Sequence, residues 1–381
     1  MRILFLIPRF YPCTGGGETY VLELGKRLVK KGHKVTVFTS NVSDKGPVAS
    51  EDEYLGIRIK RFKVIGSKEF YHFSPSIKKE LEKADVDIVH GGGFTYYGCD
   101  AAAKICKRRG IPFVITPFYH PSFTSQGARR LFRLAYDPLI GRRKLKLADK
   151  VIAMTNYEIG ELSKYTNREK FVSIPVGIDF ERLRDKSRIN DFMKKFGLEG
   201  KKILLFVGRI KENKGIQFAI SALMELDNQV CLVAAGPDGG YRKDLEKLAK
   251  GLNVQNRVIF TGVLSFNDHL SSAYNACDIF VYPSEYESFG IVAAEALACG
   301  KPVIGTNIGG TKDIVRNNEY GFLLGYGDKN GLAKAVSKLL SDSKLRNEMG
   351  KKGKEHAKKS YDWDAIVESI ISIYGSLASK K

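Results

Sequence analysis

Short apolar segments rich in β-branched residues alternate with helical segments twice along the chain, and this alternation constrains the fold more than any other feature. The apolar segments are RILFLI, KVTVFT, DVDIVH, PFVIT and KVIAMT in the first half, and KKILLFVGRI, VCLVAAG, RVIFTG, DIFVYPS and KPVIGT in the second. Strands that alternate with helices are typical of parallel sheets built from βαβ units. We therefore predict an α/β fold class with two doubly wound domains that face each other across a cleft.

The length of 381 residues also favours two domains, because chains beyond about 250–300 residues usually divide. The segment from Asp179 to Gly200 is charged and weakly periodic, and a new strand begins directly after it. We predict an N-terminal domain of residues 1–185 and a C-terminal domain of residues 186–360. Residues 361–381 are expected to form a helix that packs back on the N-terminal domain, although packing on the other domain stays open.

All apolar runs are shorter than the stretch of about 18–20 residues that crosses a membrane. The first run ends at Pro8 and Arg9, which makes it too short for a secretory signal. We therefore expect a cytoplasmic protein.

The net charge of +20 is unevenly distributed: residues 1–190 carry +15 and residues 191–381 carry +5. A basic first half indicates an anionic partner. Lipid headgroups, nucleic acid, a phosphorylated substrate and an ordinary solvated surface all stay open at this point.

Parallel α/β sheets bind ligands at the carboxyl ends of their strands, and three such places in the sequence are unusual. The first is PCTGGGETY, where Gly15, Gly16 and Gly17 follow the first strand and precede a helix. Consecutive glycines let backbone amides approach an anion closely at a helix N-terminus. A plain structural turn fits the same residues.

The second place is FVGRIKENKGI, where Arg209 directly follows a strand and Lys214 lies five residues further on. An arginine fork and a lysine point charge at one edge of a sheet can neutralise a diphosphate. Two exposed surface cations are the alternative.

The third place is YPSEYESFGIVAAEALACGKPVIGT, in which Glu287 precedes a helix predicted from Gly290 to Ala298 and Glu295 lies inside it. The backbone amides of Phe289, Gly290 and Ile291 are left unpaired by the helix, so they can bind an anion between the two acids. Carboxylates accept hydrogen bonds from hydroxyls, which fits one acid on a sugar and one on a ribose. A capping acid and a buried ion pair are the structural alternative.

Glu287 and Glu295, with seven residues between them, resemble the E-x7-E signature of the retaining glycosyltransferases of family 4, which have the GT-B fold of two Rossmann-like domains. The similarity extends to GGGE, GRIKENKG and FTGVLS. This resemblance implies transfer of a sugar from a nucleotide-diphosphate sugar of UDP, GDP or ADP type to an acceptor. It also implies retention at the anomeric carbon and no obligatory metal cofactor.

The resemblance further implies roles for individual residues. Arg209 and Lys214 hold the diphosphate, Glu295 binds the ribose, and Glu287 with the following amides binds the donor sugar and distal phosphate. Gly16 and Gly17 close over the phosphates from the first domain. The implied donor-binding set is Gly16, Gly17, Arg209, Lys214, Gly262, Val263, Glu287, Ser288, Phe289, Gly290, Ile291 and Glu295.

The catalytic set implied by the resemblance is Glu287, His120, Arg209 and Lys214. His120 lies in VITPFYHPSF, after a strand of the first domain, where the family has a histidine near the transferred sugar. Pro121 follows it where many relatives have an acid. No residue stands out as a covalent nucleophile, so we favour a front-face displacement in which the departing phosphate helps to deprotonate the acceptor.

A stretch from Gly127 to Lys150 interleaves basic and apolar residues, as at the surface of an anionic membrane. Asp137 and Pro138 are predicted to divide it into two short helices. We expect peripheral attachment to the inner face of the cell membrane and a lipid-linked or phospholipid acceptor, or else a helix pair with basic outer faces. The predicted contacts are Arg129, Arg130, Arg133, Arg142, Arg143 and Lys144.

Two other enzyme classes fit the same fold, a nucleotide-sugar epimerase and a phosphorylase, although no site for a pyridoxal cofactor is recognisable. A nucleic-acid-binding module is the alternative outside enzymes, but no recognition motif supports it beyond the basic charge. We expect a nucleotide sugar and a glycosyl acceptor as partners, and nucleic acid as an unlikely one.

Overall fold

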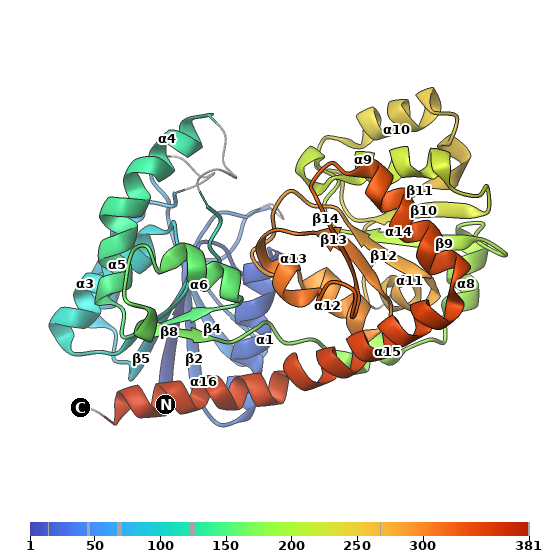
Figure 1. Cartoon of the computed structure of the whole chain (residues 1–381). Coiled ribbons are helices and arrows are strands. Elements are labelled where there is room, and N and C mark those ends of the chain that lie inside the picture. Colours follow the sequence, from blue (N-terminus) through green and yellow to red (C-terminus); the bar gives the residue numbers. More distant parts are fainter. Residues whose placement is uncertain (14, 44–45, 67–70, 122–126, 267, 380–381) are drawn as a thin grey trace. The chain divides into compact units, whose positions relative to one another are not determined.

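The computed structural model describes the chain except for residues 14, 44–45, 67–70, 122–126, 267 and 380–381. The chain forms two compact units (Figure 1). Unit 1 comprises Met1–Val176 and Trp363–Lys381, and unit 2 comprises Gly177–Asp362. The charged segment at which we placed the boundary contains two short helices, α7 (Phe180–Arg184) and α8 (Ile189–Lys195), which pack on α11 (Leu270–Ala276) of unit 2.

Unit 1 contains an eight-stranded sheet in the order β3-β4-β2-β1-β5-β6-β7-β8. Every neighbouring pair is parallel except the hairpin of β3 and β4. The strands are β1 (Arg2–Leu6), β2 (Lys34–Ser40), β3 (Glu51–Tyr54), β4 (Ile57–Phe62), β5 (Ile88–Gly92), β6 (Phe113–Thr116), β7 (Lys150–Ala153) and β8 (Phe171–Ser173).

Unit 1 also contains helices and helical turns, several of which pack against the sheet. They are α1 (Gly16–Lys30), α2 (Pro75–Lys83), α3 (Tyr97–Arg109), α4 (Gly127–Tyr136), the π-helical η2 (Asp137–Gly141), α5 (Arg142–Leu147), α6 (Asn156–Leu162), the 3-10 turn η3 (Arg168–Lys170) and α16 (Trp363–Ala378). One hydrophobic core of unit 1 lies between α3 and the sheet, around Val89, Ala102 and Phe113.

Unit 2 contains a six-stranded parallel sheet in the order β11-β10-β9-β12-β13-β14. The strand order reverses between β9 and β12, as in the doubly wound Rossmann fold, and this point is where such sheets bind ligands. The strands are β9 (Lys202–Val207), β10 (Val230–Ala235), β11 (Val258–Gly262), β12 (Ile279–Tyr282), β13 (Val303–Thr306) and β14 (Gly321–Leu324). The prediction of doubly wound parallel sheets is confirmed.

The remaining elements of unit 2 connect these strands. They are η4 (Glu212–Lys214), α9 (Ile216–Ala222), η5 (Leu223–Glu225), α10 (Arg242–Gly251), η6 (Gln255–Arg257), α12 (Ile291–Ala298), α13 (Gly309–Ile314), α14 (Lys329–Ser341) and α15 (Ser343–Ser360).

Helix α16 belongs to unit 1, although it is the last element of the chain. The Arg27 guanidinium lies 4.9 Å from the centre of the Trp363 ring. The Tyr374 hydroxyl is hydrogen-bonded to Nδ1 of His90, whose Nε2 lies 2.8 Å from the Thr116 hydroxyl. Burial lowers the pKa of His90 to about 3, so this imidazole is neutral and joins α16 to two central strands.

The basic stretch of unit 1 forms one continuous helical run instead of the two short helices that we predicted. Asp137 and Pro138 do not separate two helices, because the π-helical η2 joins α4 to α5. Gly141 allows this run to pack closely, since a Cβ there would overlap the Phe94 ring.

Arg133 and Lys144, which we expected at the membrane surface, are buried instead. Arg133 Nε donates to Oδ1 of Asp137 at 2.6 Å, and Lys144 Nζ donates to Oδ1 of Asp100 at 2.8 Å. A buried cation is tolerated only when it is paired, and each of these two has a carboxylate at hand. Arg129, Arg130, Arg142 and Arg143 are exposed.

We predict that Lys144→Ala lowers the free energy of unfolding of unit 1 by about 3–5 kcal/mol, because it leaves the buried Asp100 carboxylate without its cation. Trp363 is the one tryptophan of the chain, so its fluorescence during urea unfolding reports on unit 1. The matched control is Lys146→Ala on the same helix, where the side chain is exposed and a change within about 0.5 kcal/mol is expected. Equal effects of the two substitutions would contradict the prediction.

Candidate functional site

The loops that follow β9 and β12 lie against each other at the switch point of the unit 2 sheet. Gly215, with φ 72°, passes so close to Pro283 that a Cβ would overlap its carbonyl oxygen. The amide of Glu285 donates to the carbonyl of Asn213 at 2.9 Å. These contacts fix Lys214, which precedes Gly215, beside the segment that contains Glu287.

Lys214 Nζ and Glu287 Oε1 form an ion pair, and only 15% and 14% of the two side chains are exposed. This pair joins two of the predicted catalytic residues. Arg209 lies at the start of the same loop, two residues after β9, and is exposed; within the described part of the chain its guanidinium has no hydrogen-bond or ion-pair partner. Lys214 is thus neutralised by Glu287, and Arg209 is available to bind an anion.

Helix α12 begins as the sequence predicts. Gly290 is its N-cap with φ 104°, and the first helical bonds run from the amides of Ala293 and Ala294 to the Gly290 carbonyl. The amides of Gly290 and Ile291 precede these bonds, and among the described residues neither has a backbone acceptor. Phe289 is buried with its ring 5.6 Å from that of Tyr361, so it offers a ligand its backbone rather than its side chain.

The start of α13, shortly after β13, lies against this segment. The amide of Gly310 donates to the carbonyl of Glu287 at 2.6 Å. A Cβ at Gly309 would overlap that carbonyl, and a Cβ at Gly310 would overlap the backbone of Phe289. These two glycines were not among the predicted site residues. The signal was the glycine pair in TNIGG directly after a strand.

Glu295 lies in the second turn of α12 and accepts a hydrogen bond from the Tyr274 hydroxyl, from Oη to Oε2, at 2.7 Å. Burial raises the pKa of Glu295 to about 7, and Asp179 adds to this effect while the tyrosine opposes it. The Glu295 carboxyl group is therefore half ionised near neutral pH. It lies in the helix that Glu287 precedes, and among the described residues no cation is paired with it.

Of the predicted base-pocket residues, Gly262 ends β11, the outermost strand on one side of the sheet, and Val263 directly follows it. Gly262 has φ 72°, and its carbonyl accepts a bond from the Gly236 amide at 2.8 Å. The side chain of Val263 is 67% exposed. Val263 therefore leaves most of its apolar surface exposed at the carboxyl edge of the sheet.

The other predicted residues belong to unit 1. Gly16 and Gly17 open α1, and a Cβ at Gly17 would lie 3.3 Å from the Phe118 ring. Phe118, with φ 47°, lies two residues before the exposed His120. The structure therefore brings the glycine turn and the histidine loop together at the carboxyl ends of β1 and β6.

Glu158 holds the histidine loop and was not found from the sequence. Its Oε1 accepts from the Tyr119 amide and its Oε2 accepts from the Met154 amide, both at 2.8 Å. The side chain is fully buried, and burial raises the pKa of this carboxyl to about 7. The sequence signal was Thr155 three residues before Glu158, a spacing typical of a helix N-terminus.

Two doubly wound units of this kind are the architecture of the GT-B fold, and comparisons with known proteins identify the class of enzyme. Residues 14–182 match the family described as Glycosyltransferase Family 4, and residues 188–356 match the family described as Glycosyl transferases group 1. The chain belongs to the family-4-like glycosyltransferases, and it is a nucleotide-sugar glycosyltransferase.

Individual relatives are distant but extend over nearly the whole chain. The N-acetyl-alpha-D-glucosaminyl L-malate synthase of Bacillus anthracis is 26% identical over 96% of this chain and 94% of its own length. The sulfoquinovosyl transferase SQD2 of Arabidopsis thaliana is 28% identical over 96% of this chain and 72% of its own length.

Solved structures show the same fold. The sucrose-phosphate synthase of Thermosynechococcus elongatus has a TM-score of 0.83 at 23% identity, and both chains are covered completely. Anabaena HepE in complex with UDP and glucose has a TM-score of 0.82 at 21% identity, over 99% of this chain and 100% of that one.

We predict that Gly310→Ala lowers the free energy of unfolding of unit 2 by about 1–3 kcal/mol, because the new methyl group overlaps the backbone of Phe289. Scanning calorimetry measures the change. The control is Gly325→Ala, where a Cβ meets open space and the backbone is not left-handed. A Gly310 variant as stable as the Gly325 variant would show that the contact between Gly310 and the Phe289 backbone does not constrain the site.

Proposed function

We propose that the chain is a retaining hexosyltransferase whose donor is a uridine diphosphate sugar bound at the carboxyl edge of the unit 2 sheet. The proposal depends most on one observation, the Lys214–Glu287 ion pair beside the start of α12. Anabaena HepE, a structure with the same fold, contains UDP, which supports the choice of nucleotide. Unit 2 supplies two cations, free amides and two acids for such a donor.

The diphosphate is expected to replace Glu287 as the ion-pair partner of Lys214. Two phosphate groups carry more negative charge than one carboxylate, and they can bind the Arg209 fork and the amides of Gly290 and Ile291 at the same time. Glu287 then loses its cation and becomes available to accept hydrogen bonds from the sugar hydroxyls. The ion pair thus neutralises Lys214 before the donor binds and leaves Arg209 as the available cation.

Leaving-group stabilisation is the main catalytic effect in this proposal. The bond between the anomeric carbon and the distal phosphate oxygen breaks, and negative charge grows on the diphosphate, where Arg209 and Lys214 lie. In a front-face displacement the acceptor hydroxyl oxygen bonds to the anomeric carbon from the same side. Its proton passes to the departing phosphate, so the configuration is retained.

We predict that Arg209→Ala and Lys214→Ala each lower kcat by about a hundredfold or more, because each removes a charge that stabilises the leaving group. The assay is the release of UDP from the sugar donor that the protein accepts. Lys211→Ala is the control, since this exposed lysine lies in the same loop and has no assigned role. Parental rates in both test variants would rule out these cations as the diphosphate ligands.

We predict that UDP affinity falls as the pH drops below about 7, approaching tenfold per pH unit. The reason is that burial raises the pKa of Glu295 to about 7, and protonation removes an acceptor for the ribose hydroxyls. Calorimetric titration between pH 5.5 and 8.5 measures this dependence. Glu295→Gln should bind weakly and keep only the dependence below about pH 6 that comes from protonation of the UDP phosphate, whereas Glu285→Gln should keep the parental profile. A parental profile in Glu295→Gln would remove Glu295 from the ribose site.

We also propose that unit 1 attaches to an anionic membrane surface and that the acceptor is lipid-linked. Arg129, Arg130, Arg142 and Arg143 are exposed, while Arg133 and Lys144 are buried and take no part. Exposed leucines accompany the arginines: Leu131 at 71%, Leu134 at 54% and Leu139 at 70%. Within the described residues no helix has the length and hydropathy needed to cross a bilayer. Attachment is therefore proposed as peripheral, on the cytoplasmic face, where anionic lipids gather.

A further inference from the structure

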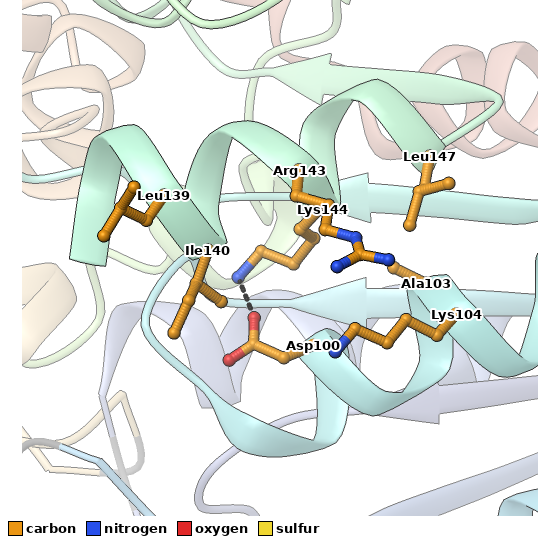
Figure 2. Close-up of a pocket in the computed structure, with 8 residues that line it drawn as sticks. All are labelled: Asp100, Ala103, Lys104, Leu139, Ile140, Arg143, Lys144 and Leu147. Atoms are coloured by element: carbon orange, nitrogen blue, oxygen red, sulfur yellow. Dashed lines mark hydrogen bonds and ion pairs between the residues drawn. The ribbon is translucent and has the colours of Figure 1, made fainter.

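A pocket of about 230 Å³ lies in unit 1 between α3 and the run formed by η2 and α5 (Figure 2). Leu139, Ile140 and Leu147 line it from that run, and Lys104 lines it from α3. None of the residues predicted to bind the donor lines it. The pocket thus needs an explanation of its own.

The floor of the pocket is polar but fully satisfied. Asp100 accepts bonds from Lys144 Nζ at 2.8 Å, from the Tyr71 hydroxyl at 2.8 Å and from the Tyr136 hydroxyl at 2.7 Å. Lys144 Nζ also donates to the Phe94 carbonyl. One carboxylate and one ammonium cancel, so the floor contributes no net charge to a ligand (Figure 2).

The rim of the pocket is cationic. Lys104 on α3 and Arg143 on α5 both line the pocket and are both exposed. In the ranges for which the structure gives positions, neither side chain has a hydrogen-bond or ion-pair partner. An arginine fork with a nearby lysine is a favourable arrangement for phosphate. The pocket as a whole therefore carries positive charge that is complementary to a phosphate ester.

The apolar part of the pocket indicates where this phosphate comes from. Leu139 and Ile140 are 70% and 45% exposed beside the cations. A soluble phosphate ester would leave both side chains in water, whereas a bilayer would cover them. The volume is below the range of about 300–1,000 Å³ typical of small-molecule sites, which suits a headgroup whose hydrocarbon chains stay in the membrane.

We propose that this pocket binds the phosphate headgroup of an anionic glycerophospholipid, with Lys104 and Arg143 on the phosphate and with Leu139 and Ile140 in the interface of the bilayer. The inference rests on the membrane attachment proposed above and assigns that attachment a site. The lipid held here is a docking lipid and takes no part in sugar transfer.

The test compares neighbouring cations that differ in whether they line the pocket. Arg143→Gln and Lys104→Gln change pocket residues, and Arg142→Gln and Lys107→Gln change exposed residues next to them that lie outside it. Binding to phosphatidylglycerol vesicles, with phosphatidylcholine vesicles as reference, is measured by co-sedimentation. The outer variants should lose about fivefold, as expected for one cation near an anionic surface. The pocket variants should lose at least tenfold more than that, because they also lose charge-assisted hydrogen bonds.

Equal losses in all four variants would overturn the inference and leave only general attraction between charges. Glycerol 3-phosphate at millimolar concentration should not displace the protein from vesicles, and displacement would overturn the choice of a membrane lipid. Failure of the unaltered protein to bind either vesicle would overturn the pocket and the membrane attachment together. UDP binding, titrated without vesicles, tests the donor site separately, and its absence would contradict the donor proposal alone.

A second measurement follows the apolar side chains. Leu139→Trp adds a fluorophore at the pocket, while the buried Trp363 gives a constant background. Its emission should shift to the blue on phosphatidylglycerol vesicles and should be quenched by brominated acyl chains. An unshifted emission in protein that has bound to vesicles would overturn the insertion of Leu139.

Discussion

The Lys214–Glu287 ion pair is the interaction on which the site in unit 2 depends. It forms because two loops meet at the point where the strand order of the sheet reverses, and Gly215 allows their backbones to pass almost in contact. Gly310, in the first turn of α13, then donates its amide to the Glu287 carbonyl. Backbone contacts therefore position Glu287, so its carboxylate stays in place when Lys214 binds a ligand instead.

In unit 1 some basic side chains are buried in ion pairs and others are exposed, and the basic stretch contains both kinds. Arg133 and Lys144 stabilise the packing of α4 and α5 as partners of Asp137 and Asp100, whereas Arg143 is exposed beside them. Breaking a buried pair is costly, but an exposed cation contributes little to stability. The exposed cations are thus open to a role in binding, and the buried ones act as structural supports.

Much of the fold could be predicted from the sequence because its central strands are short apolar runs that are covered on both faces. Strands β9 and β12 and the start of α12 lie where the residue pattern indicated. Only continuous apolar runs were taken as strands, so β4, whose apolar and charged residues alternate, and β3, where Glu51–Tyr54 is acidic and lies at an edge, were missed.

The parts of the site that the sequence did not reveal depend on contacts between distant segments. Gly310 resembles any loop glycine until the backbone of Phe289 is placed against it. Arg133 and Lys144 have the same local pattern as their exposed neighbours, and only the positions of Asp137 and Asp100 in space distinguish them. Glu158 likewise reads as a helix-capping acid, and its bond to the Tyr119 amide appears only when β6 and β7 are paired.

The most direct test of the account is a crystal structure of the protein with UDP. We expect the diphosphate within hydrogen-bonding distance of Arg209, Lys214 and the amides of Gly290 and Ile291, with the ribose hydroxyls on Glu295 and the Lys214–Glu287 pair opened. A diphosphate bound elsewhere on unit 2, with that ion pair intact, would contradict the central claim that the switch point of this sheet is the donor site.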